Sequence, residues 1–335
     1  MFGIAAFGTS LGQPSAVADV VGEYSEDVER ILGYGYTTVH RAPDGVQVSG
    51  LAGQAAERAL TASGTDPAQV DLLVFALTDI SEYLYWDAAT ALQNRLGLRC
   101  ESVLVTQACT AALSGLDLVA GRFATHPDYQ TALLVGANRC CDAYWNRMQT
   151  QSMVFSDGAA AAVAVRAHDR RRWLASRAVS DGRFADFYRM DVGGAASPFR
   201  AGAAEQPAAN DAWDIMDFFD YDDEQFAAFT KLIDTRAREV VEAACAGAGV
   251  KRADLRHVFF LHDNQRAMTS FAAALEIPLD RTNAATGLAT GHLGAADQLY
   301  SLDRALAAGV VGDGDLVALV GLGRGMHWAC TVLEL

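Results

Sequence analysis

Short apolar segments alternate with segments of helical periodicity along almost the whole chain, and this alternation predicts an α/β architecture. In the first half, strands are expected at 2–7, 70–77, 102–106, 131–136 and 158–165, and helices at 51–63, 83–96 and 110–123. In the second half, strands are expected at 175–179, 257–261, 316–322 and 326–333, and helices at 224–246, 265–275 and 294–308. The Gly/Ala-rich stretch 181–211 is expected to be an irregular insertion. The charged run HDRRR separates the halves, so we predict two domains, 1–168 and 169–335.

The overall charge of the chain argues against several classes of partner. It has 26 basic and 41 acidic residues and a net charge of −15, whereas nucleic-acid phosphates are bound by clustered Lys and Arg. The same deficit of positive charge argues against docking on anionic lipid. No stretch is apolar enough to predict a membrane span, and the first residues lack the basic and apolar parts of a signal peptide. We therefore expect a cytoplasmic protein without nucleic-acid or membrane partners.

The six cysteines do not form a recognisable disulfide or metal-binding pattern. They are spread over the chain without paired CxxC spacings, which favours a reducing compartment and no metal site. Five of them are expected to be small buried hydrophobic residues: Cys100, Cys140, Cys141, Cys245 and Cys330.

Cys109 stands in a different context, the segment SVLVTQACTAALSGLDLVAG. An apolar strand ends at Val105, and the chain then turns into an Ala/Leu-rich helix. Cys109 is thus expected at a helix N-terminus, where the helix dipole favours a thiolate and raises its nucleophilicity. A structural cysteine remains the alternative interpretation of this segment alone.

Two histidines follow apolar strands or loops in the second half. His262 lies in VFFLHDNQRAMTSFAAAL, with Asn264 and Arg266 close behind it. His292 lies in ATGLATGHLGAADQLYSLDRAL, five residues before Asp297. On a continuous helix five residues are about 140° apart, which is poor for contact. If His292 lies in the loop that enters the helix, Asp297 in the first turn can orient its imidazole as a carboxylate orients a general base.

The chain ends in VALVGLGRGMHWACTVLEL, two apolar strands around a glycine-rich turn at 321–325. Main-chain N–H groups of such a turn, including those near Gly323 and Arg324, are candidates to bind an oxyanion. A plain hairpin is the alternative.

Together these segments resemble, in order and spacing, the thiolase superfamily and specifically its β-ketoacyl-acyl-carrier-protein synthase III branch. VTQACTAALSGLDLVAG resembles the nucleophile segment, MVFSDGAAAAVAV a signature at the end of the first half, and GLGRGMHWACTVLEL the C-terminal glycine-rich turn. LHDNQRAM stands where the first active-site His of that branch occurs, and GHLGAAD stands at its GN-[ST]-x-A-A-S run. The likeness covers nearly the whole chain. It implies a five-layered αβαβα core of two duplicated βαβαβ halves, and a homodimer.

The departures from this pattern concern the catalytic residues. Condensing enzymes of the branch use Cys, His and Asn, whereas His292 stands at the position that resembles the Asn and Asp297 replaces a Ser. Asn264 belongs to DNQR rather than to the family's QAN, so its match to the family's Asn at that strand end is open. An Asn amide donates to an enolate oxygen without titrating, whereas a neutral His backed by an Asp is a general base. The replacement favours deprotonation of an acceptor over decarboxylative condensation.

The pattern resembles the ketosynthase-III-like acyltransferases of antibiotic and polyketide pathways, which use Cys or Ser, His and Asp. The resemblance implies that Cys109 takes an acyl group from an acyl-carrier-protein or CoA thioester, with Cys109, Gly323 and Arg324 supplying oxyanion N–H groups. His292, oriented by Asp297, then deprotonates a hydroxyl, amine or carrier-protein acceptor. His262, with Asn264, is expected as a further active-site residue that donates to the thioester carbonyl or binds a polar acyl group. No metal or redox cofactor is implied.

Other functions stay open at this point. The main alternative is a decarboxylating 3-oxoacyl-ACP synthase III-type condensing enzyme in which His262 and His292 together polarise malonyl thioester. A silent partner subunit has no need of a nucleophilic Cys, and thiolase-like cleavage lacks a second Cys in the C-terminal turn.

The places where partners bind are less defined by the sequence. Arg266 is a candidate for carrier docking, and the run Arg170, Arg171 and Arg172 is either a second candidate or a solvated loop. The stretch 213–229 forms either a lid or acceptor wall, or a helix packed on the core. Tyr83, Tyr85 and Trp86 line either an acyl tunnel or a dimer interface.

Overall fold

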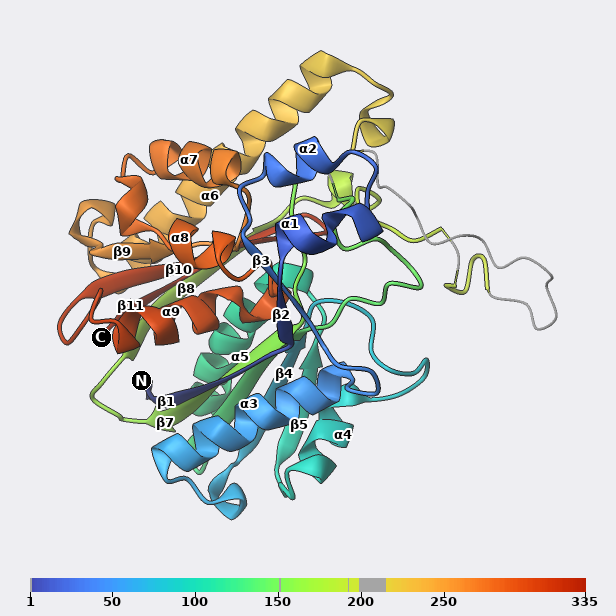
Figure 1. Ribbon diagram of the computed structural model, residues 1–335. Coiled ribbons are helices and arrows are strands. Elements are labelled where there is room, and N and C mark those ends of the chain that lie inside the picture. Colours follow the sequence, from blue (N-terminus) through green and yellow to red (C-terminus); the bar gives the residue numbers. More distant parts are fainter. Residues whose placement is uncertain (1, 151, 192, 199–214) are drawn as a thin grey trace.

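The computed structural model describes residues 2–150, 152–191, 193–198 and 215–335 (Figure 1). Nine strands form one hydrogen-bonded series in the order β5-β4-β6-β7-β1-β8-β11-β10-β9. The strands of the first half are β1 (Phe2–Leu11), β4 (Leu72–Leu77), β5 (Glu101–Val105), β6 (Thr131–Asn138) and β7 (Gly158–Arg166). Those of the second half are β8 (Arg172–Ser180), β9 (His257–Phe259), β10 (Leu316–Gly323) and β11 (His327–Glu334).

The two halves repeat the same pairing of strands. In the first half β4 is parallel to β6, which pairs antiparallel with β7, which pairs antiparallel with β1. In the second half β9 is parallel to β10, which pairs antiparallel with β11, which pairs antiparallel with β8. The halves meet where Gly3 of β1 pairs with Arg172 of β8. The edge strand β5, which is parallel to β4, also has a counterpart in the second half. There Val258 of β9 forms a single parallel bridge with Thr282.

The helices divide these strands into layers (Figure 1). α5 (Ala111–Thr125) and α9 (Asp297–Ala307) lie between the two halves of the strand series and contact strands of both. α3 (Val48–Ser63) and α4 (Ala88–Arg95) cover the outer face of the first half, and α6 (Asp223–Ala248) and α7 (Gln265–Ala274) cover the outer face of the second. The predicted five-layered αβαβα core of two duplicated halves is therefore confirmed. The chain crosses from one half to the other between β7 and β8, and the division into domains at residues 168 and 169 stays a prediction.

Small residues let the middle layer approach the first half closely. Ala132, Ala160, Ala162 and Ala164 belong to the same buried cluster as the apolar face of α9. At Gly136 of β6 an added Cβ would lie 2.4 Å from the carbonyl oxygen of Ala295. The turn that precedes α9 is thus pressed against β6, close to the turn that precedes α5.

The ends of the helices follow the rules that the sequence suggested. α3 stops at Gly64, whose φ of +67° is left-handed. α6 is capped by Asp222, which accepts hydrogen bonds from the main-chain N–H groups of Glu224 and Gln225, and it ends at Gly249. The helix expected at 83–96 is shorter, because Asp87 caps α4 and residues 83–86 form a loop in which Tyr85 has a φ of +55°.

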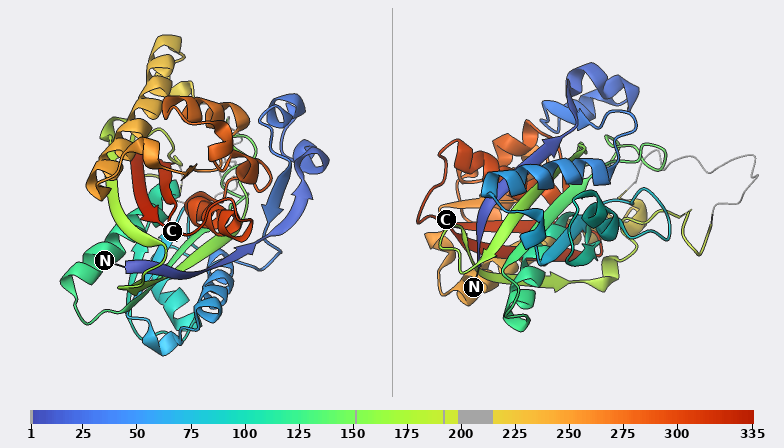
Figure 2. Two further views of the ribbon diagram at one scale, coloured as in Figure 1. Left: turned by 90° about the vertical axis from the view of Figure 1, so that its left-hand side faces the viewer. Right: turned by 90° about the horizontal axis from the view of Figure 1, so that it is seen from below.

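One part of the fold was not predicted. Between β1 and α3 the chain forms the hairpin β2 (Gln13–Ala16) and β3 (Thr38–Arg41), with α1 (Val17–Val20) and α2 (Val28–Leu32) between them. This segment projects from the layered body in both views of Figure 2. The short helix α8 (Ala284–Leu288) precedes the site loop. The insertion expected at 181–211 lies partly outside the described residues, as do residues 213 and 214 of the expected lid.

Within the described ranges, no helix is both long and apolar enough to cross a membrane.

The packing of α9 between the sheets generates a stability prediction. Leu299 is fully buried in the middle layer, so Leu299→Ala leaves a cavity and is expected to lower the free energy of unfolding by about 2–5 kcal/mol. Val310, which is exposed, is the matched control, and Val310→Ala should change stability by less than about 0.5 kcal/mol. Urea unfolding measures both, and equal effects of the two substitutions would contradict the assignment of α9 to the core.

Candidate active site

Cys109 lies in a tight turn between β5 and α5. The chain leaves β5 at Val105, forms a short 3-10 helix over Ala108–Thr110 and continues directly into α5. Ala108 has a φ of +49°, a left-handed conformation that is unusual for a residue with a Cβ. The turn leaves Cys109 partly exposed at the N-terminal end of the buried helix, where its thiol faces a cavity.

His292 is the residue that contacts this thiol. Its Nε2 lies 3.0 Å from the Sγ of Cys109, and its side chain is completely buried. The main chain of His292 forms a parallel bridge with Phe155, donating to the carbonyl of Val154 and accepting from the N–H of Ser156. The Phe155 ring packs edge-on against the imidazole, with 4.6 Å between ring centroids. The imidazole therefore has one orientation.

Asp297 fixes the other side of that imidazole. Its Oδ2 lies 2.6 Å from the Nδ1 of His292 and also accepts the main-chain N–H of His262 at 2.7 Å. Its Oδ1 accepts the main-chain N–H of Leu293 at 2.7 Å. His292 and Asp297 can contact each other although they are five residues apart in sequence. Gly294 has a φ of +59°, and a 3-10 turn over Gly294–Ala296 separates His292 from the first residue of α9. Asp297 thus reaches back to the loop that enters its own helix.

The charges of these groups depend on one another. Burial alone lowers the pKa of His292, but the charges of Asp297 and of the Cys109 sulfur outweigh it and hold that pKa well above its ordinary value. Burial raises the pKa of Asp297, but the His262 and His292 rings outweigh it and hold the carboxyl below its ordinary value. Asp297 is therefore ionised, and it accepts the Nδ1 proton of His292. The Nε2 of His292 then faces Cys109, which is the arrangement of a thiolate–imidazolium pair.

The ring of His262 is bonded to protein groups on both sides, and its role toward the thioester carbonyl or a polar acyl group stays a prediction. Its Nδ1 lies 2.8 Å from the carbonyl oxygen of Gly291 and 3.1 Å from Asp297 Oδ1, so this nitrogen must donate. Its Nε2 lies 2.7 Å from the hydroxyl of Ser301, which in turn accepts from Asn283. Burial lowers the pKa of His262, which is consistent with a neutral ring. Both nitrogens are occupied behind Asp297, and the ring does not line the cavity.

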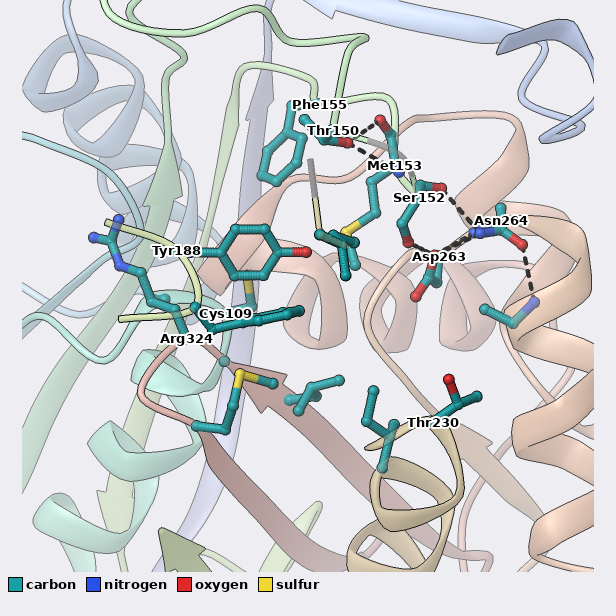
Figure 3. Close-up of a pocket in the computed structure, with 18 of the residues that line it drawn as sticks. Cys109, Thr150, Ser152, Met153, Phe155, Tyr188, Thr230, Asp263, Asn264 and Arg324 are labelled. Atoms are coloured by element: carbon teal, nitrogen blue, oxygen red, sulfur yellow. Dashed lines mark hydrogen bonds between the residues drawn. The ribbon is translucent and has the colours of Figure 1, made fainter. Parts of the chain in front are cut away.

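A cavity of about 700 Å³ opens at Cys109 (Figure 3). Its walls come from several elements of both halves and are mainly apolar, including Met153, Phe155, Phe187, Phe226, Phe229, Ile233, Phe271 and Leu322. Polar side chains are fewer; among them are Arg30, Tyr34, Tyr188, Asp263, Asn264, Arg266 and Arg324. The volume and the apolar walls suit a small organic group with an extended arm.

The described part of the segment 213–229 belongs to this cavity. Ile215, Phe226 and Phe229 line it, and Phe229 also packs among the buried aromatic residues under α6. This segment therefore forms part of the cavity wall and also packs on the core, so both of the structures considered for it are present.

Asn264 and Arg266 lie at the start of α7. Asn264 caps this helix, accepting from the main-chain N–H of Ala267, and its amide donates to the carbonyl of Ser152. Arg266 is exposed and lines the cavity, so its role in carrier docking remains open as a prediction.

The run 170–172 makes contacts within the chain, and its role in docking stays a prediction. Arg170 pairs with Asp313, Arg172 pairs with Glu334, and Arg171 donates to the carbonyls of β1.

The glycine-rich turn after β10 approaches the nucleophile. An added Cβ at Gly323 would lie 2.8 Å from the carbonyl oxygen of Gln107 and 3.3 Å from the N atom of Thr110. The main-chain N–H of Arg324 donates to no main-chain carbonyl of the described residues, and the Arg324 side chain donates to the carbonyl of Thr78. The oxyanion role of Cys109, Gly323 and Arg324 stays a prediction.

The sequence analysis missed several polar residues of the cavity, and Asp263 is one of them. Asp263 is buried and lines the cavity one residue beyond His262. The available signal was a carboxylate at the end of a strand that leads into the site. Among the described residues, no group of three or more His, Cys, Asp or Glu side chains is arranged to hold a metal ion.

Comparisons with known proteins agree with this architecture. Residues 105–182 match the family 3-oxoacyl-[acyl-carrier-protein] synthase III, and residues 245–335 match its C-terminal family. The chain is 29% identical over 291 residues to β-ketoacyl-[acyl-carrier-protein] synthase III of Synechocystis sp., covering 86% of this chain and 83% of the relative. It is also 29% identical to the enzyme of that name from Laribacter hongkongensis, covering 88% of this chain and 86% of the relative.

Solved structures share the fold over the full length. ChlB3, an acyltransferase, superposes with a TM-score of 0.86 at 24% identity, covering 100% of this chain and 97% of the other. AbyA1, a tetronic acid condensing enzyme, superposes with a TM-score of 0.79 at 22% identity, covering 100% of both chains. The 3-oxoacyl-(acyl carrier protein) synthase III of Pseudomonas aeruginosa has a TM-score of 0.79 at 22% identity, covering 99% of this chain and 98% of the other.

The thiolate–imidazolium arrangement generates a prediction about cysteine reactivity. An imidazolium at His292 stabilises negative charge on the Cys109 sulfur, so iodoacetamide should alkylate Cys109 readily at pH 6. His292→Asn removes this cation, and alkylation of Cys109 at pH 6 should slow by about tenfold or more.

Peptide mapping by mass spectrometry separates Cys109 from the partly exposed Cys100 and Cys141, whose rates serve as internal controls. Identical pH profiles of Cys109 alkylation in the wild type and in His292→Asn would show that the pair does not form.

Proposed function

The chain belongs to the β-ketoacyl-acyl-carrier-protein synthase III-like branch of the thiolase superfamily and is an acyltransferase of that branch, and on this premise we propose its reaction. The enzyme takes an acyl group from an acyl-carrier-protein or CoA thioester onto Cys109. It then transfers this group to a hydroxyl, amine or carrier-protein acceptor in secondary metabolism. Cys109 is the nucleophile, His292 the general base and Asp297 the residue that orients the base.

The observation that supports this proposal best is the relay from Cys109 through His292 to Asp297. The two hydrogen bonds of the relay, 3.0 Å and 2.6 Å, occupy both nitrogens of one buried imidazole. A titratable ring in this place can remove a proton from an incoming acceptor. An uncharged amide, which the condensing enzymes have there, donates and accepts hydrogen bonds but does not take up a proton.

In the first half-reaction the Cys109 thiolate attacks the carbonyl carbon of the thioester. The oxyanion that forms is held by main-chain N–H groups at Cys109 and at the Gly323–Arg324 turn, and loss of one such donor typically costs roughly two to three orders of magnitude in rate. When the intermediate collapses, the bond to the donor sulfur breaks. His292 protonates the departing thiolate, which leaves a neutral imidazole and an acylated Cys109.

The second half-reaction uses the change of charge that acylation causes. The negative charge of the Cys109 sulfur is one of the causes that raise the pKa of His292, and the thioester has no such charge. The neutral imidazole is therefore available as a base once Cys109 is acylated. It removes the acceptor proton, the acceptor attacks the acyl carbon, and the electrons of the broken bond return to the Cys109 sulfur.

The cavity is consistent with donors of this kind. Its apolar walls, between the two halves of the chain, suit an acyl group and the arm of a phosphopantetheine or CoA thioester. Arg30 and Arg266, which also line it, are the cations we propose for contact with the donor's phosphate or with an acidic carrier. Secondary metabolism is the context that the likeness to ChlB3 and AbyA1 favours.

The second candidate function is decarboxylative condensation of the 3-oxoacyl-ACP synthase III type. The names of the curated relatives and of AbyA1 favour it. The position of His262 disfavours it, because both ring nitrogens of His262 are occupied, whereas His292 contacts Cys109 directly.

A substitution at His292 tests the proposal. A panel of acyl-CoA and acyl-carrier donors is incubated with the enzyme, and intact-mass spectrometry records the acyl group, which Cys109→Ala should not accept. His292→Asn should still be acylated, because attack on the thioester is also assisted by the helix N-terminus. Transfer to the acceptor should then slow by roughly two to four orders of magnitude. Transfer by His292→Asn at the wild-type rate would mean that His292 is not the base.

We also propose a homodimer. β5 is the edge strand of the series and is half-buried along its length, although it consists largely of Val and Leu. The neighbouring loop exposes Tyr83 and Leu84. An apolar sheet edge of this kind is expected to be covered in solution.

Light scattering at micromolar concentration should give about 71 kDa, twice the 35.6 kDa of one chain. Val103→Lys, which places a charge on β5, should shift the mass toward the monomer. A wild-type mass near that of one chain would contradict the dimer.

A further inference from the structure

Asp263 is a buried carboxylate of the cavity that the relay does not use. It lies between β9 and α7, and its side chain is held through one oxygen only. Oδ1 accepts from the hydroxyl of Ser152 at 2.8 Å, from the main-chain N–H of Asn264 at 2.7 Å and from the Asn264 amide at 3.2 Å. Because Asn264 is itself fixed as the cap of α7, the carboxylate is held rigidly.

The second oxygen of this carboxylate has no protein partner in the described parts of the chain. No residue there donates a hydrogen bond to Oδ2, and no Lys, Arg or His forms an ion pair with Asp263. Asp263 is only 7% exposed, and its burial raises its pKa to about 6, so it is mostly ionised at neutral pH. Oδ2 is not among the fully buried polar atoms that lack a partner, so it faces the cavity, where a donor on a bound ligand can pair with it.

Asp263 and Cys109 line the same cavity. The main-chain N–H of His262, the residue before Asp263, donates directly to Asp297, which ties this strand end to the relay. The charge of His292 influences Asp263, and the charges of Cys109 and Asp263 both influence Tyr188. Figure 3 shows Cys109 beside Tyr188, and the Asp263 carboxylate farther along the cavity, next to Ser152 and Asn264.

We propose that Asp263 Oδ2 binds a hydrogen-bond donor of the acceptor, and that the acceptor is a small molecule with a second hydroxyl or an ammonium group beside the hydroxyl that is acylated. This inference rests on the proposed function. His292 takes the proton of the reacting hydroxyl, its oxygen forms the bond to the acyl carbon, and the electrons of the broken bond return to the Cys109 sulfur. Asp263 accepts a hydrogen bond from the neighbouring group and exchanges no proton.

The chemistry of the alternatives explains this choice. A diol, a sugar or an amino alcohol offers a donor to Oδ2 and an adjacent hydroxyl to His292. A simple alcohol leaves the buried carboxylate unpaired, and sites built to bind a donor discriminate strongly against ligands that lack it. The thiol of a carrier's phosphopantetheine has one amide N–H, two carbons from its sulfur, which is a single neutral donor, so pantetheine is the rival acceptor in the test.

The test separates loading from transfer in the full-length enzyme. Cys109 is first acylated, and the rate at which its acyl mass is lost is then measured with propan-1-ol, propane-1,2-diol, 2-aminopropan-1-ol, methyl α-D-glucopyranoside and pantetheine. The wild type should prefer the diol, the amino alcohol or the glycoside over propan-1-ol by at least about tenfold in kcat/KM. Asp263→Asn and Ser152→Ala should reduce this preference to less than about threefold, whereas loading of Cys109 should slow by less than about threefold.

The matched control is Asp303→Asn, which removes a partly buried carboxylate of α9 that does not line the cavity, and it should retain the wild-type preference. A preference that survives both Asp263→Asn and Ser152→Ala, or a wild type that transfers only to pantetheine, would overturn the proposal. If wild-type Cys109 never becomes acylated, the proposed function itself fails. If both variants lose structure by circular dichroism, Asp263→Ser, which keeps a small polar group, must lose the preference.

Discussion

The carboxylate of Asp297 organises the active site. Its two oxygens accept main-chain N–H groups from His262 and Leu293, which come from different segments, and it also accepts the Nδ1 proton of His292. One buried charge therefore holds the end of β9, the loop before α9 and the imidazole in a single arrangement. A neutral residue of the same size would leave these donors without a charged acceptor, and charge-assisted bonds are about twice as strong as neutral ones. The orientation of His292 toward Cys109 follows from this carboxylate.

The duplicated fold explains why the parts of the site come from both halves. Cys109 follows the edge strand of the first half, and His292 follows the corresponding bridge of the second half. α5 and α9 begin at these two turns, which contact each other, and both helices lie between the sheets (Figure 1). The small residues of β6 and β7 let the two turns approach each other, and the cavity opens where they meet. The site is thus built on the rigid middle layer, while most of its cavity walls come from α6, α7 and the loops.

The sequence predicted local features well and features that depend on distant partners less well. Cys109 at the start of a helix follows from an apolar strand and an Ala/Leu-rich helix that are adjacent in sequence. The contact between His292 and Asp297 needed only the assumption of a turn before α9, for which Gly294 is suited. The direction of the His262 ring could not be predicted, because it is set by Ser301 and Gly291, far along the chain. The hairpin β2–β3 was missed because its strands have only four residues each and little alternation.

We propose that the relay transfers an acyl group to an acceptor instead of condensing it with the unit that malonyl thioester supplies on decarboxylation. One portion of acyl-loaded enzyme is mixed with a hydroxyl acceptor, and a second portion is mixed with carboxyl-labelled malonyl thioester. In both portions the acyl mass on Cys109 and the released carbon dioxide are measured. The account predicts that the hydroxyl acceptor clears Cys109 while malonyl thioester neither clears it nor releases labelled carbon dioxide. Release of carbon dioxide in step with loss of the acyl group, with a 3-oxoacyl thioester as product, would contradict it.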